Sequence, residues 1–221
     1  MTRQKFEKAK SPRLVYALVF VVSVVVVCAA VYLTSTQGHW LGVFFSNKQL
    51  NMATDGARPA TWAHRLELPG VPNFHKVSGA LYRGAQPSAE GMEQLEKLGI
   101  KTVVNLRSLH SDRDEISDTG LAYEHIRMKT WNPETEDVVR FLKVVTDSNR
   151  TPVFVHCQRG ADRIGMMCAI YRAAVQGWSE AEAAEEMTKG GFGFYSGWQD
   201  LIDYVLKLDV DEIRRGAALS E

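Results

Sequence analysis

A short apolar segment near the middle of the chain is followed almost at once by an apolar helix. Residues 151–157, TPVFVHC, have the length and composition of a strand that is buried on both faces of a sheet. Residues 163–178, RIGMMCAIYRAAVQGW, are typical of a largely apolar helix that ends near Gly177. A buried strand joined by a short loop to a buried helix favours a layered α/β fold.

The neighbouring segments continue this alternation of strands and helices. Ser88 and Gly99 have the positions of an N-cap and a helix terminator, and Ser179 with Glu182 forms a capping-box pattern. The expected strands are 79–85, 100–106, 121–128 and 151–157, and the expected helices are 87–99, 133–149, 163–178, 180–189 and one or two within 196–215. The sequence therefore predicts an α/β fold with a mainly parallel central sheet flanked by helices.

An uncharged apolar segment lies near the start of the chain. Residues 14–33 contain no charged side chain, and twenty residues at about 1.5 Å each span the hydrocarbon core of a bilayer. A cleaved signal peptide is the alternative, but its apolar region is shorter and ends at a small-x-small site, which VYLTSTQGHW does not offer. We therefore expect one uncleaved transmembrane helix. Because five Lys and Arg residues precede it, the N-terminus is expected in the cytosol and the remainder outside, in the periplasm of a bacterium.

The overall charge and the cysteine count narrow the possible functions. The chain has 26 basic and 26 acidic residues, so nothing in its net charge indicates nucleic acid as a partner. Cys28 lies in the apolar segment, and Cys157 and Cys168 are expected to be too far apart for a disulfide. Two free thiols in an oxidising compartment indicate that one of them is needed chemically.

The sequence HCQRGADR places a thiol where an anion is favoured. Cys157 lies at the carboxyl end of a strand and before a helix, where unpaired N–H groups and the helix dipole favour a thiolate. Gly160 permits a loop whose N–H groups point inward, the guanidinium of Arg163 can grip two phosphoryl oxygens, and His156 can hold the loop. The expected phosphate-binding residues are Gln158, Arg159, Gly160, Ala161 and Arg163. A phosphate-binding loop with a thiolate at its base predicts phosphoryl transfer to sulfur followed by hydrolysis, with no metal or other cofactor.

This His-Cys-(five residues)-Arg pattern resembles the signature of cysteine-dependent phosphatases. LYRGAQPSAEGMEQLEKLGIKTVVNLRS and GGFGFYSGWQDL resemble dual-specificity-like members in bacteria, and the resemblance covers about residues 64–207. It implies a protein tyrosine phosphatase-like fold, with Cys157 as nucleophile and a phosphocysteine intermediate. The expected divisions of the chain are then a basic cytosolic tail at 1–13, the anchor at 14–33, a linker at 34–63 and a phosphatase-like domain at 64–221.

The general acid is less clearly marked. Phosphatases of this class usually protonate the leaving oxygen with an Asp from a separate upstream loop, but that region here holds Glu124 and His125 in an expected strand. Asp162 is our first candidate, because Cys-x-x-Gly-x-Asp-Arg is similar to the pattern of lipid-directed relatives such as the myotubularins and Sac phosphatases. The alternative role of Asp162 is structural, as the ion-pair partner of Arg163 or of another basic residue. The second candidates are the acids at the start of the helix at 133–149, which are also ordinary helix N-terminal residues: Glu134, Glu136 and Asp137.

Ile164 departs from the family pattern. The family normally has Ser or Thr directly after the arginine, and that hydroxyl donates to the cysteine sulfur, which isoleucine cannot do. We therefore expect slower breakdown of the phosphocysteine intermediate. The alternative is a non-catalytic phosphate-binding pseudophosphatase.

The substrate is left open between two classes. The resemblance implies phosphotyrosine or phosphoserine proteins as substrates, whereas Arg159 and the anchor favour a phospholipid or inositol-phosphate headgroup. Residues 105–115 and Arg83 are expected to line or brace the site, with ordinary surface charges as the alternative. His110 and the acids near it match no familiar metal-ligand spacing, so we predict no metal site.

Overall fold

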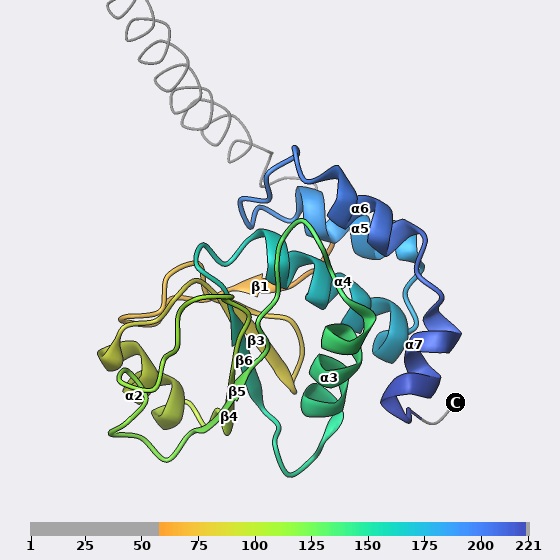
Figure 1. The fold of residues 1–221 in the computed structure, drawn as a ribbon. Coiled ribbons are helices and arrows are strands. Elements are labelled where there is room, and N and C mark those ends of the chain that lie inside the picture. Colours follow the sequence, from red (N-terminus) through yellow and green to blue (C-terminus); the bar gives the residue numbers. More distant parts are fainter. Residues whose placement is uncertain (1–57, 220–221) are drawn as a thin grey trace, which may run out of the picture. The chain divides into compact units, whose positions relative to one another are not determined.

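The computed structural model describes residues 58–219, whose strands form one mixed six-stranded sheet (Figure 1). The strand order in the sheet is β1-β2-β3-β6-β4-β5, in which β3, β6, β4 and β5 are parallel and β1 and β2 are antiparallel. The strands are β1 (His64–Arg65), β2 (His75–Lys76), β3 (Leu81–Gly84), β4 (Thr102–Asn105), β5 (Ala122–His125) and β6 (Val153–His156). The predicted mainly parallel sheet is confirmed.

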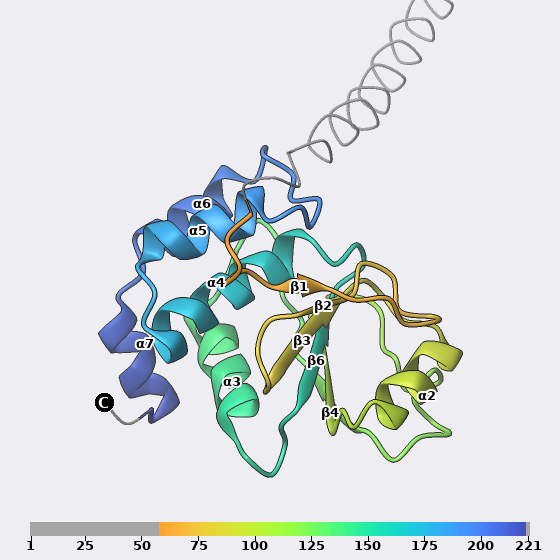
Figure 2. The ribbon, with the colours of Figure 1, turned by 180° about the vertical axis from the view of Figure 1, so that it is seen from behind.

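Helices cover both faces of this sheet. Figures 1 and 2 show α2 on one face and α3 and α4 on the other, with α5, α6 and α7 outside them. The helices are α2 (Ala89–Lys97), α3 (Thr135–Thr146), α4 (Asp162–Gln176), α5 (Glu180–Lys189), α6 (Gln199–Leu206) and α7 (Val210–Ala217). Because side chains alternate along a strand, Phe154 of β6 packs in the core under α2, whereas Val153 and Val155 pack in the larger core under α3 and α4.

Most of the predicted elements are present with shorter ends. Ser88 is the N-cap of α2 and accepts from the backbone N–H of Gly91 at 3.2 Å, and the capping box of Ser179 and Glu182 opens α5. The helix expected at 133–149 covers only Thr135–Thr146. The sequence analysis missed β1 and β2, because two-residue strands are too short to show an alternating pattern.

The strand register brings three loops to one edge of the sheet. His156 of β6 is paired with Gly84 of β3 on one side and with Asn105 of β4 on the other. The segments that follow these three strands therefore leave the sheet side by side. This edge is the carboxyl end of the parallel strands, where ligands bind in α/β folds.

The N-terminal predictions fall largely outside the described residues. The apolar segment at 14–33 lies there, and within residues 58–219 no helix is long and apolar enough to cross a bilayer. The end of the expected linker at 34–63 packs on the domain: Ala63 is buried, and its backbone N–H donates to Glu186 Oε1 at 2.6 Å. Ala63, at the end of the expected linker, is thus part of the packed domain.

Candidate active site

Cys157 lies directly after β6 and shortly before the first residue of α4. Its side chain is 2% exposed, whereas Gln158 and Arg159 after it are exposed. The carbonyl of His156 accepts from the backbone N–H of Leu106 at 2.9 Å, so the end of β6 is held by the segment after β4. The predicted arrangement of strand, thiol, loop and helix is present.

Gly160 lets the loop approach the end of β3. Its φ is +74°, a conformation that residues with a Cβ rarely adopt. A Cβ at this position would lie 2.6 Å from the backbone nitrogen of Ala85, which is far inside van der Waals contact. Only glycine fits here without displacing the backbone.

Two side chains from earlier segments hold the carbonyl groups of this loop. Arg83 of β3 is buried, and its Nη2 donates to the carbonyls of Gly160 at 3.1 Å and Ala161 at 3.3 Å. Asn73 Nδ2 donates to the carbonyls of Arg159 and Gly160, both at 3.1 Å. Because C=O and N–H point in opposite directions across a trans peptide, the amides that follow these carbonyls point away from Arg83 and Asn73. Those N–H groups remain available to an anion.

Asp162 connects this loop to the segment before α6. Its Oδ2 accepts from Arg159 Nη2 at 2.7 Å, and its Oδ1 accepts from the backbone N–H of Tyr195 at 2.9 Å. Arg163 instead donates to the carbonyl of Leu106 at 3.1 Å. The structural partner of Asp162 is therefore Arg159 and not Arg163. Both oxygens of Asp162 are occupied, so its role as general acid stays a prediction.

A buried acid–base pair lies behind the nucleophile. His156 Nε2 donates to Asp112 Oδ2 at 2.7 Å, and both side chains are fully buried. Asp112 Oδ1 accepts from Gln86 Nε2 at 2.9 Å, and the Asp112 N–H donates to the Tyr123 hydroxyl at 3.0 Å. Burial raises the pKa of Asp112, but the hydrogen bonds from His156 and Gln86 outweigh it and leave the pKa below its ordinary value. His156 is thus held by Asp112, and its role in holding the loop stays a prediction.

The second group of candidate acids lies at the start of α3. Glu134 is the N-cap residue without a side-chain cap bond, and Glu134 and Glu136 are exposed. Burial and the nearby charge of Glu134 raise the pKa of Asp137, which favours the protonated form that a general acid needs. Glu134 and Asp137 line a polar pocket of about 520 Å³ with Arg113 and His125. Among the described residues, no hydrogen bond joins these acids to the loop at 157–163.

Ile164 and Cys168 lie on the buried face of α4. Ile164 is fully buried and has no group that could donate to the sulfur of Cys157. Burial raises the pKa of the Cys168 thiol to about 11, so that thiol stays protonated at neutral pH. Cys157 and Cys168 are both free, as predicted.

Comparisons with known proteins decide the family. The family described as "DSP-PTPase phosphatase fused to NAD+ Kinase" matches residues 71–197. The chain belongs to this family of DSP-type phosphatases. It is also 33% identical over 183 residues to the dual specificity protein phosphatase TpbA of Pseudomonas aeruginosa, over 82% of this chain and 83% of that protein. The predicted cysteine-dependent phosphatase class and dual-specificity-type fold are confirmed.

Solved structures of relatives agree with this phosphatase fold. The crystal structure of P. aeruginosa TpbA matches with a TM-score of 0.65 and 32% identity, over 73% of this chain and 99% of that one. The core catalytic domain of the PP-IP phosphatase SIW14 from S. cerevisiae matches with a TM-score of 0.60 over 69% of this chain and 94% of that one. At 24% identity, this second match shows the fold alone. Inositol diphosphatase DSP5 of Arabidopsis thaliana is 29% identical over 131 residues, 53% of this chain and 61% of that protein.

Two supporting residues of the phosphatase loop were missed by the sequence analysis. Asn73 and Tyr195 come from segments distant in the chain, and no local pattern marks them. Asp112 was expected only as one of residues 105–115, which line or brace the site, and not as the partner of His156. A buried acid facing the histidine of the signature can be found only when the strand order is known.

Proposed function

We propose that this phosphatase hydrolyses phosphotyrosine and phosphoserine residues of proteins through Cys157. The observation that carries the proposal is the loop itself, with a thiol at its start and carbonyls held outward by Arg83 and Asn73. Cys157 Sγ attacks phosphorus, the bond from phosphorus to the leaving oxygen breaks, and a general acid protonates that oxygen. Water then attacks the phosphocysteine, which releases phosphate and the thiolate. Arg163 and the loop amides stabilise the equatorial oxygens in both steps.

The relatives support a protein substrate. A cysteine-to-serine variant of P. aeruginosa TpbA has been crystallised in complex with pTyr, and it is 32% identical to this chain over 74% of this chain and 100% of that one. The alternative is an inositol-phosphate or phospholipid headgroup. It is favoured by the similarity to the inositol diphosphatase DSP5 and by the half-exposed guanidinium of Arg159 beside the loop.

The deciding experiment measures phosphate release by the full-length chain under reducing conditions with a chelator. Phosphotyrosine peptides, phosphoserine peptides, phosphoinositides and an inositol pyrophosphate are compared beside the Cys157→Ser variant. We expect the highest kcat/KM on phosphotyrosine peptides. In the Cys157→Ser variant kcat/KM should fall by at least about 10³-fold. A preference for an inositol compound selects the alternative, and absence of turnover with retained vanadate binding identifies a pseudophosphatase.

The general acid can be assigned with two leaving groups. A general acid matters for a phenyl or alkyl phosphate, whose leaving oxygen is basic, and matters little for a nitrophenyl phosphate. If Asp162 is the acid, Asp162→Asn slows only the basic leaving group, by about 10²–10⁴-fold. Equal losses of rate on both substrates would mean that Asp162 only supports the loop. Asp137→Asn would then be measured on the same two substrates.

We also propose that residues 14–33 anchor the enzyme and that its catalytic domain faces the periplasm. The uncharged segment and the five basic residues before it support this topology. Protease added to bacterial spheroplasts that express the chain should degrade the catalytic domain. Protection of that domain until the membrane is lysed would contradict the proposed orientation.

A further inference from the structure

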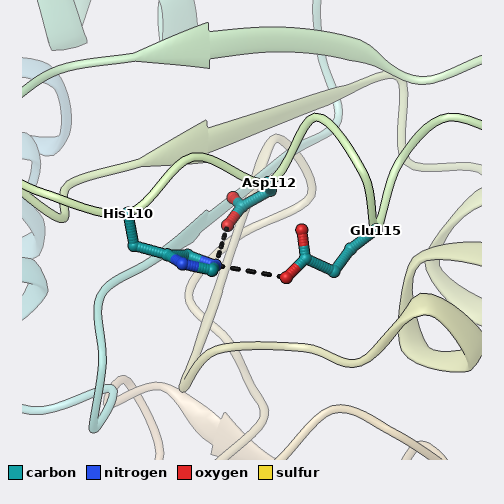
Figure 3. A group of neighbouring side chains, drawn as sticks. All are labelled: His110, Asp112 and Glu115. Carbon is teal, nitrogen blue, oxygen red and sulfur yellow. Dashed lines mark ion pairs between the residues drawn. The ribbon is translucent and has the colours of Figure 1, made fainter.

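Three potential metal ligands converge in the loop between β4 and β5. The side chains of His110, Asp112 and Glu115 point toward one another in Figure 3, and one ligand atom from each lies within 4.8 Å of the others. Asp112 is fully buried, whereas the side chains of His110 and Glu115 are 34% and 27% exposed. The group is therefore open to solvent on one side, which gives an ion a path of entry.

Two distances from His110 are close to the separation expected between ligands of one ion. His110 Nε2 lies 3.4 Å from Asp112 Oδ1 and 3.2 Å from Glu115 Oε1. Ligands at about 2.0–2.2 Å from a tetrahedral zinc ion are separated by about 3.3–3.6 Å. Moreover, His110 Nε2 and Glu115 Oε2 are atoms shielded from solvent that lack a hydrogen-bond partner in the structure. Such unpartnered atoms are costly unless another group satisfies them.

The backbone and neighbouring side chains hold these ligands in place. Asn105 Nδ2 donates to the carbonyl of His110 at 2.9 Å, and the Asp112 N–H donates to the Tyr123 hydroxyl at 3.0 Å. Gln86 donates to Asp112 Oδ1 at 2.9 Å, which leaves that oxygen a second lone pair. Supporting hydrogen bonds to metal ligands of this kind orient them and strengthen binding.

We propose that His110 Nε2, Asp112 Oδ1 and a carboxylate oxygen of Glu115 bind one Zn²⁺, with water in the fourth position. One imidazole and two carboxylates suit a divalent transition ion of borderline softness. The ion has no part in the cysteine chemistry proposed above. It acts on that chemistry through Asp112, whose other oxygen binds His156 next to Cys157. Zinc draws the Asp112 carboxylate toward itself, loosens its hold on His156 and thereby lowers turnover.

Zinc binding is tested first without the reactive thiol, which would itself bind zinc. The full-length chain with Cys157→Ser is titrated with Zn²⁺ against a chromophoric chelator. His110→Asn and Glu115→Gln are added singly to this background, with His64→Asn as the matched control, because His64 is an exposed histidine in β1 at the opposite edge of the sheet. Circular dichroism confirms that each variant is folded.

The expected result is one Zn²⁺ per chain in the background and the control, and at least about tenfold weaker binding in the two ligand variants. Absence of stoichiometric binding, or binding that both ligand variants leave unchanged, overturns the site. With Cys157 restored, His110→Asn should raise the zinc concentration that halves turnover by the factor by which it weakens binding. Inhibition that does not change in this variant overturns the coupling to Asp112.

Discussion

At the scale of single residues, Ile164 separates two steps of the reaction. Its fully buried side chain fills the position after Arg163 with a group that cannot donate a hydrogen bond. Formation of the phosphocysteine does not need such a donor, whereas departure of the thiolate in the second step is helped by one. We therefore expect the first step to proceed normally and the second step, breakdown of the phosphocysteine, to be slow.

Ile164→Thr should raise turnover by about 10- to 100-fold, because one hydrogen bond to a charged sulfur is worth about 1.5–3 kcal/mol. Rapid-quench kinetics on an aryl phosphate check this expectation, since a burst of leaving group in the natural chain should weaken in the variant. Ile164→Val is the control, because it keeps the branched shape without a donor. Equal burst amplitudes in all three chains would refute this account of Ile164.

At the scale of elements, the phosphate loop depends on contact with β3. Gly160→Ala places a methyl group 2.6 Å from the Ala85 nitrogen and forces a residue with a Cβ into a left-handed conformation, which alone costs about 1–2 kcal/mol. Since the loop must shift, we expect more than about tenfold loss of kcat/KM. Gly79→Ala is the matched control, because a Cβ at Gly79 meets no atom within 4 Å. Full activity of Gly160→Ala would show that the loop tolerates displacement.

Helices α4 and α5 are joined by a buried ion pair. Arg172 Nε and Nη2 donate to the two oxygens of Glu186 at 2.7 and 2.8 Å, and both side chains are almost fully buried. Arg172 also donates to the carbonyls of Thr61 and Val77 at 3.1 and 3.2 Å. Arg172 therefore ties the segments before β1 and after β2 to helices α4 and α5.

Glu186→Gln should lower the free energy of unfolding by about 3–5 kcal/mol, because it leaves the Arg172 charge buried without its counterion. Urea unfolding measures this loss. Glu185→Gln breaks only an exposed pair with Lys189 on the same helix and should cost no more than about 1 kcal/mol. Similar losses in the two variants would mean that burial does not strengthen the Arg172–Glu186 interaction.

At the scale of the whole molecule, acid should destabilise the fold through His75. Burial lowers its pKa from 6.5 to about 4, although its hydrogen bond to the Asn73 carbonyl acts in the opposite direction. Below pH 6.5 the unfolded chain binds a proton that the folded chain does not yet bind, so stability falls as the pH falls from 6.5 to about 4. The full loss is about 3 kcal/mol.

Urea unfolding at pH 7 and pH 4.5 checks this prediction. His75→Gln should be less stable at pH 7 because it loses its contact with Phe192, but its stability should change less between the two pH values. His64→Gln changes an exposed histidine, so its stability should change between the two pH values as much as that of the natural chain. If His75→Gln lost as much stability between pH 7 and pH 4.5 as the natural chain, His75 would not be the cause of the acid destabilisation.

The sequence by itself determined the parallel sheet, the main helices and the loop that follows Cys157. These features are local: a buried strand, a helix start and a glycine turn each follow from neighbouring residues. The resemblance to the phosphatase signature marked Ile164 as a departure. The sequence also places Asp162 near the thiol, but it could not show that Arg159 and Tyr195 occupy both of its oxygens.

Only the tertiary structure decided which distant groups surround the site. The order β3-β6-β4 brings Arg83, Asn105 and Asp112 to the two sides of His156, although long stretches of chain separate them. Hydrogen bonds of this kind depend on strand order, and strand order depends on how both faces of the sheet are buried at once. The periodic pattern of one segment does not indicate which strands will be its neighbours in the sheet.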